Sequence, residues 1–213
     1  MWYDLKRFTT EKKIKMIINN RVYFIHIPRT AGRFLYKSLI LNNYNVRLNN
    51  FNITFKGKEV PHLTYPEYCQ FTHYRPLKRF CIVRDPVDRF LSMIKDTWML
   101  DEEQVDKMFK NQNYFDQMVN DICVNSSSNW FVPQNNFIDY KTKIWRFEDK
   151  FNVEFTDWLF HNFNLKLKEL PVYYKQDYKS NLPNNNLNKI TLNNEQIGYI
   201  KDYYYKDYKI LNY

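Results

Sequence analysis

Continuous apolar runs alternate along the chain with stretches in which apolar residues recur every three to four positions. The runs at residues 22–27, 80–84 and 143–147 predict buried strands. Helical spacing predicts helices at 32–41, 65–71, 87–98, 101–110, 114–124, 151–163 and 194–208. Shorter strands are expected at 44–48 and 52–55, a helical lead-in at 6–15 and a polar loop at 178–192.

This alternation of strands and helices favours an α/β fold. We expect three layers, with a central parallel β-sheet flanked by helices. No internal repeat or linker interrupts the pattern, and 213 residues suffice for one sizeable core. Residues 1–213 are therefore expected to form a single domain.

The first predicted strand runs through a short basic turn, residues 28–33, straight into a helix. Amides at a helix N-terminus lack intrahelical acceptors, and the helix dipole favours an anion there. Gly32 is one of only 3 glycines in the chain, and it lies in this turn. The layout is P-loop-like, but it is not a Walker A motif, because no glycine opens the turn and no Lys-Ser/Thr pair closes it.

The second apolar run ends in Arg84 and leads through Asp85 and Pro86 into another helix. Asp85 suits the N-cap position and Pro86 the first helical position. Ser92 falls on the first turns of that helix. Because ligands of parallel α/β sheets collect at the carboxyl ends of strands, Arg84 and Ser92 are expected to meet a second phosphate.

Together these stretches resemble the sulfotransferases that use 3′-phosphoadenosine 5′-phosphosulfate (PAPS). That family has a 5′-phosphosulfate loop of the form PKTxGTS and a 3′-phosphate motif of the form RDPxxRxxS; residues 28–32 (PRTAG) and 84–92 (RDPVDRFLS) are similar to them. The closest branch is that of the carbohydrate sulfotransferases of the heparan sulfate 2-O- and 6-O-type, with an HIPKTAG loop. Residues 133–134, 144–148 and the tail at 197–213 also resemble that branch.

The resemblance implies a set of site residues and one departure from the family. It implies that the nucleotide PAPS, and its product PAP, contact Arg29, Thr30, Ala31, Gly32, Arg33, Phe34, Arg84 and Ser92. Arg29 replaces the family's lysine and is expected to neutralise the leaving phosphate. Arg33 and Phe34 replace a Thr-Ser pair, so one hydroxyl is lost. Gln134 is a candidate contact to the acceptor.

The general base is sought among 4 histidines. His62 lies in a segment, residues 60–65, that resembles the branch's base-bearing stretch, and it is our candidate catalytic residue together with Arg29. His26, inside the first strand, equally suits a buried structural role. His161 lies in a late helix, and His73 and Glu67 are reserve candidates for the base.

A net charge of +9 suits an anionic ligand, and both a doubly phosphorylated nucleotide and an acidic glycan qualify. The basic residues are spread along the chain, so no nucleic-acid partner is expected. No apolar run approaches the ~20 residues that span a bilayer, and the first residues lack the apolar core of a signal peptide. We therefore expect a cytoplasmic protein without membrane contact.

Composition adds two expectations. The 3 cysteines have no metal-ligand spacing, which predicts reduced thiols and no metal site. Abundant asparagine and lysine with few glycines is typical of an AT-rich genome, viral or microbial.

The sequence thus predicts a sulfotransferase that moves the sulfuryl group from PAPS to a hydroxyl, expected to be on a carbohydrate, by in-line displacement with a histidine base. Two alternatives remain open. One is a P-loop-type nucleotide kinase, which would normally need the missing Walker residues. The other is a non-catalytic module on the same fold that binds an anion or nucleic acid.

Overall fold

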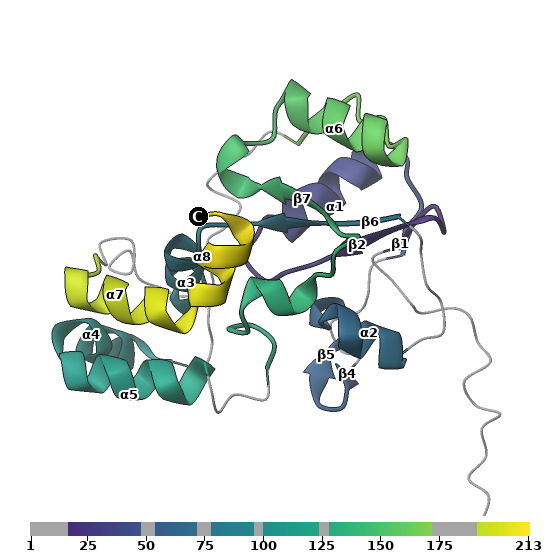
Figure 1. Ribbon diagram of the computed structural model, residues 1–213. Helices are drawn as coiled ribbons and strands as arrows, with labels where there is room; N and C mark the ends of the chain where they lie inside the picture. The colour runs from purple at the N-terminus through teal and green to yellow at the C-terminus, as the bar shows by residue number, and fades with distance from the viewer. Residues whose placement is uncertain (1–16, 48–53, 72–77, 96–99, 124–127, 172–190) are drawn as a thin grey trace, which may run out of the picture.

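The computed structural model describes residues 17–47, 54–71, 78–95, 100–123, 128–171 and 191–213 (Figure 1). A five-stranded sheet lies at its centre, in the order β3 (Val46–Arg47), β1 (Ile17–Ile18), β2 (Val22–Ile25), β6 (Lys78–Val83) and β7 (Lys143–Arg146). β2, β6 and β7 are parallel neighbours, whereas β1 runs antiparallel to both β2 and β3. Four of the five strands therefore point the same way.

This sheet confirms an α/β architecture, although the sheet is mixed rather than wholly parallel. Within the predicted strand at 44–48, β3 covers Val46–Arg47, and residue 48 lies outside the described residues. The one at 52–55 forms β4 (Thr54–Phe55), which pairs with β5 (Lys58–Glu59) in a separate hairpin instead of joining the sheet. β1 was not predicted, because two apolar residues are too few to give a pattern.

Eight α-helices occur among the described residues. They are α1 (Gly32–Leu41), α2 (Tyr65–Phe71), α3 (Pro86–Ile94), α4 (Glu102–Lys110), α5 (Gln112–Cys123), α6 (Val153–Phe163), α7 (Asn194–Tyr203) and α8 (Tyr205–Leu211). Short 3₁₀ turns are η2 (Val60–His62), η3 (Gln134–Phe137) and η4 (Phe147–Asp149). No helix in these parts of the chain has the length and apolar character to cross a membrane.

Predicted and observed helices agree closely, with one break. α1 and α2 have the predicted bounds, but the helix expected at 194–208 is divided at Tyr204 into α7 and α8. The Tyr204 side chain is buried, and its hydroxyl donates to the Phe131 carbonyl at 2.8 Å. The lead-in at 6–15 and nearly all of the loop at 178–192 lie outside the described residues.

The buried apolar residues fall into two clusters. One surrounds the sheet and includes residues of α1, α2 and α6. The other lies among α3, α4, α5 and α7, which gather beside the end of the sheet at which β6 finishes (Figure 1). The carboxyl ends of β2 and β6 are neighbours, since Ile25 is in register with Cys81, so both predicted phosphate motifs leave the sheet at one place.

Candidate phosphate-binding site

The loop from β2 to α1 contains two non-glycine residues in the left-handed region, Arg29 (φ 66°) and Ala31 (φ 69°). Such conformations are uncommon outside glycine and gather at functional sites. Ala31 occupies the N-cap of α1, and the intrahelical bonds begin with the Leu35 amide, which donates to the Ala31 carbonyl at 3.1 Å. The preceding amides therefore lie at the helix N-terminus, where an anion is favoured.

The two predicted motifs touch each other. The Arg29 Nε atom donates to the Ser92 Oγ atom at 3.1 Å, across 63 residues of sequence. Arg29 is half-buried and belongs to the loop, while Ser92 lies on α3. A guanidinium and a hydroxyl are thus brought together at the carboxyl ends of β2 and β6, although the sequence paired Ser92 with Arg84 rather than with Arg29.

Gly32 is required by a close approach rather than by its backbone conformation. A Cβ atom there would lie 1.9 Å from the His26 Nε2 atom, so only glycine lets the helix start against this imidazole. His26 is buried, and its Nδ1 atom has no hydrogen-bond partner among the described residues. Burial lowers the pKa of His26 well below its usual value, helped by the charges of His62, Arg33 and Arg29.

Two predicted site residues, Thr30 in the loop and Phe34 in the first turn of α1, use their side chains for structure. The Thr30 hydroxyl is fully buried and donates to the Ile27 carbonyl at 2.9 Å. The Phe34 ring is buried with its centroid 4.6 Å from that of Phe151. Phe34 can therefore contribute only its backbone to an anion site, while Arg33 is exposed on the first turn of α1.

Arg89, the second arginine of the motif at 84–92, supports the loop between β2 and α1 through hydrogen bonds. It is fully buried, and its Nε atom donates to the Pro28 carbonyl at 3.1 Å. Its second terminal nitrogen donates to the carbonyls of Trp130 (2.7 Å) and Val132 (3.1 Å). These carbonyl bonds tie the loop to residues 130–132, so Arg89 has a structural role.

The corner after β6 has the predicted helix start. The Asp85 carboxylate accepts from the amides of Val87 and Asp88, each at 2.9 Å, and Pro86 is the first helical residue. The Arg84 guanidinium lies over the Phe147 ring, with the centroid 4.6 Å away. Its Nε atom is buried and finds no acceptor among the described residues, which suits a site for an anionic ligand.

His62 lies on the turn η2 and is only 4% exposed, rather than displayed on an open loop. Its Nδ1 atom is 3.3 Å from the His26 carbonyl oxygen, and its Nε2 atom is 3.6 Å from a Glu59 carboxylate oxygen. When Nδ1 carries the proton, the lone pair is on Nε2. Burial lowers the pKa of His62, although the bond to His26 and the charge of Glu59 oppose that shift.

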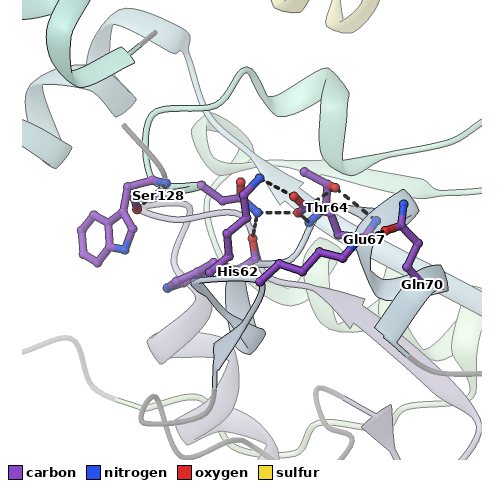
Figure 2. A network of polar contacts seen from close by, with 9 residues as sticks. His62, Thr64, Glu67, Gln70 and Ser128 are labelled. Carbon is purple, nitrogen blue, oxygen red and sulfur yellow. Dashed lines mark hydrogen bonds and ion pairs between the residues drawn. The ribbon is translucent and has the colours of Figure 1, made fainter. Parts of the chain in front are cut away.

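Glu67, a reserve candidate for the base, is the centre of a structural network (Figure 2). Its carboxylate accepts from the Thr64 amide at 2.8 Å and the Thr64 hydroxyl at 2.9 Å. The Glu67 amide donates back to that hydroxyl at 3.4 Å, which completes a capping box at the start of α2. The Asn129 amide donates to it at 2.6 Å, and Lys58 forms an ion pair. Burial raises the pKa of Glu67, but these bonds outweigh burial and lower it.

Of the other two histidines, His161 lies away from this cluster. His73 lies outside the described residues. His161 is exposed on α6, with its Nδ1 atom 2.7 Å from the Asp157 carbonyl oxygen, and α6 lies across the sheet from α2 (Figure 1). Among the residues that the structure describes, no group of three or more His, Cys, Asp or Glu side chains could hold a metal ion.

Sequence reasoning missed several residues that shape the site. Asn129 is buried, and its amide donates to the His62 carbonyl at 2.9 Å as well as to Glu67 (Figure 2). The Trp130 indole donates to the Glu59 carboxylate at 3.1 Å, and its ring meets His62 edge-on at 5.8 Å. Both follow a polar run that predicts only a loop, so no local signal marks them.

Comparison with known proteins adds no identification. No family model, curated protein or solved structure matches this chain.

Proposed function

We propose that this protein is a PAPS-dependent sulfotransferase on a P-loop-like fold, which transfers the sulfuryl group to a hydroxyl of a carbohydrate. The observation that carries the proposal is the contact between Arg29 Nε and Ser92 Oγ at 3.1 Å. It joins the residues that resemble a 5′-phosphosulfate loop to those that resemble a 3′-phosphate motif. A nucleotide with phosphates at both ends fits two such adjoining anion sites.

In this proposal the chain holds the nucleotide by charge and backbone amides. The start of α1, with the Gly32 amide, faces the 5′-phosphosulfate, and Arg84 with Ser92 faces the 3′-phosphate. As the acceptor oxygen bonds to sulfur, the bond between sulfur and the bridging oxygen breaks, and its electron pair stays on the phosphate of PAP. Arg29 neutralises that developing charge, which lowers the barrier more than it strengthens binding.

His62 takes the acceptor proton as the new bond forms. The His26 carbonyl, 3.3 Å from Nδ1, favours the tautomer whose Nε2 can accept a proton, and Glu59 at 3.6 Å stabilises the imidazolium that results. Because His62 is buried, a neighbouring side chain must move when the acceptor binds, so that the acceptor hydroxyl can reach the imidazole. The proposal invokes neither a metal ion nor nucleic acid, and it places the protein in the cytoplasm.

Two measurements test this function. Titration calorimetry should give tighter binding of PAP than of AMP, ATP or an oligonucleotide, because only PAP fills both phosphate sites. Sulfur-labelled PAPS, incubated with a panel of glycans, should transfer label to at least one acceptor without added metal. A chain that binds PAP no better than AMP would remove the proposal.

A second candidate is a module that binds PAP or a related anion without turnover. The burial of His62 at 4% exposure favours it, because a general base must reach the acceptor. Tight PAP binding with no label transfer to any acceptor on the panel would support this alternative.

A further inference from the structure

The C-terminal helix α8 reaches the corner that contains Arg84, although about 120 residues separate them in sequence. Asp207 of α8 is fully buried, and its carboxylate accepts from the amides of Gln134 and Asn135, both at 2.8 Å. Burial raises the pKa of Asp207, and these two bonds oppose that shift. The carboxylate thus fixes the start of η3.

Gln134 carries this contact on to Arg84. Its side chain is fully buried and bonds to both backbone groups of Arg84: the Arg84 amide donates to Oε1 at 3.0 Å, and Nε2 donates to the Arg84 carbonyl at 2.7 Å. Such a two-sided bond holds the peptide of Arg84 in one orientation. The residue is therefore not the acceptor contact that the sequence suggested.

A second connection runs from the tail to the neighbouring residue, Asp85. The Tyr213 hydroxyl donates to one oxygen of Glu148 at 3.0 Å, and the Asp85 amide donates to the other at 2.7 Å. The Tyr208 hydroxyl lies 3.4 Å from the Asp85 carboxylate. The tail thus fixes the peptide between Arg84 and Asp85 indirectly. Gln134 bonds to its carbonyl, and Glu148 bonds to its amide.

We propose that α8 is a positioning element for the 3′-phosphate end of the nucleotide site, acting through Asp207 and Gln134 on the backbone of Arg84. This inference rests on the proposed function, because it assigns Arg84 to the 3′-phosphate. The guanidinium lies over Phe147 with Nε unpartnered in the described structure, so its aim is set by the backbone that Gln134 holds. A shift of that backbone would move the guanidinium away from the phosphate.

The test is the ratio of PAP to AMP affinity in variants that leave Arg84 itself unchanged. Gln134→Met keeps the side-chain length but removes both bonds to Arg84, and Asp207→Asn replaces one acceptor of the η3 amides by a donor. Each should reduce the PAP/AMP ratio about tenfold while AMP affinity stays near that of the wild type. Gln196→Met is the matched control, because Gln196 is also buried and hydrogen-bonded but lies on α7, where its amide donates to Phe109. The Gln196→Met protein should be less stable than the wild type but should keep the wild-type ratio of PAP to AMP affinity.

Folded Gln134→Met and Asp207→Asn proteins that keep the wild-type ratio would overturn the inference. If neither variant folds, amide exchange of the wild type decides: PAP should slow exchange at Gln134, Asn135 and α8 more than AMP does, and equal exchange with both ligands would overturn it. Failure of the proposed function looks different, since the wild type would then show no preference for PAP at all, and both ideas would fall.

Discussion

The loop after β2 holds two non-glycine residues, Arg29 and Ala31, in the left-handed region, whereas residues 84–92 after β6 contain none. The loop is shaped by close packing: the His26 ring lies against Gly32, and Arg89 holds the Pro28 carbonyl from behind. The corner after β6 is instead shaped by hydrogen bonds from distant segments, through Gln134 and Glu148.

This difference indicates that the two regions suit different parts of the proposed reaction. A strained loop with buried imidazoles beneath it suits the chemical step, because charge and proton transfer depend on groups held in unusual environments. A corner held by paired hydrogen bonds suits recognition, because it fixes the direction of one guanidinium. Substitutions on the loop side should therefore change turnover and stability, and substitutions at the corner should change nucleotide selectivity.

The largest expected effect is on turnover, from His62→Ala. Loss of a positioned base lowers kcat by roughly 10²–10⁴, while PAP affinity should stay within about threefold because the proposed function assigns the residue to the acceptor and not to the nucleotide. Since burial lowers the pKa of His62, the wild-type rate should fall on the acid side at a pH below 6.5, and the variant should lose that limb. Label transfer measured from pH 5 to 8 checks both points.

One control variant and a measurement of PAP affinity show how a loss of turnover in His62→Ala should be interpreted. His161→Gln, on the exposed face of α6, should leave both turnover and its acid limb unchanged. If His62→Ala lowers kcat and PAP affinity together, the residue serves to hold η2 in place through the His26 carbonyl and is not the base. Normal turnover in the variant would shift attention to His73.

A second prediction concerns Arg29, whose charge, in the proposed reaction, is needed as the bond to the leaving phosphate breaks. Arg29→Ala should lower kcat more than it weakens PAP binding, and Arg29→Lys should remain active, because a cation is kept. A single-turnover assay with calorimetry separates the two effects. Equal losses in kcat and PAP affinity would make Arg29 a binding residue that resembles Arg84.

At the corner, Arg84→Ala should weaken PAP binding by about 1.5–3 kcal/mol, or roughly 10- to 100-fold, and leave AMP binding nearly unchanged. Calorimetry with both nucleotides measures the difference. An unchanged preference for PAP would show that the 3′-phosphate is held elsewhere.

The sequence was sufficient to predict β2, β6 and β7, most helices, and the position of both motifs after the carboxyl ends of β2 and β6. These depend on local periodicity, on caps such as Asp85, and on the rule that neighbouring parallel strands end at one edge. The antiparallel strand β1 was not predictable, because pairing of two residues is decided by the surrounding sheet. The break at Tyr204 has the same kind of cause, a buried hydroxyl bonded to a distant carbonyl.

Side-chain roles were harder to predict than elements. Thr30 lies in the expected loop and Phe34 in the expected helix, but their side chains turn into the core, which depends on tertiary packing. Asp207 and Gln134 act across more than 70 residues, and neither lies in a pattern that marks such a contact. Motif spacing therefore predicted where the two motifs lie in the fold better than what their side chains contact.

Stability should respond more to the loop than to a comparable change elsewhere. Gly32→Ala would place a Cβ atom 1.9 Å from His26 Nε2, and overpacking of this kind costs about 1–3 kcal/mol. Gly198→Ala is the matched control: no atom lies within 4 Å of its Cβ position in α7, and the gain in helix propensity should make it neutral or stabilising by about 0.5–1 kcal/mol. Denaturant unfolding of both variants measures the difference. In a His26→Ala background, Gly32→Ala should cost much less, and an unchanged cost would show that the imidazole is not what requires glycine.

The smallest expected effect is the pH dependence of stability, which should also divide the two regions. Burial lowers the pKa of both His26 and His62 below the usual 6.5, so as the pH falls through 6.5 the unfolded chain binds protons that the folded chain does not. Stability contributed by these neutral imidazoles is therefore present above pH 6.5 and lost below it.

Asp207, near the corner after β6, has the opposite effect on stability. Burial raises its pKa, so the folded chain takes up that proton first and gains stability as the pH falls through the raised value. Melting temperatures measured from pH 7.5 to 5.5 should decline in the wild type and decline less in His62→Gln. Equal slopes for the two proteins would mean that His62 does not resist protonation in the folded state, which would contradict the lowering of its pKa by burial.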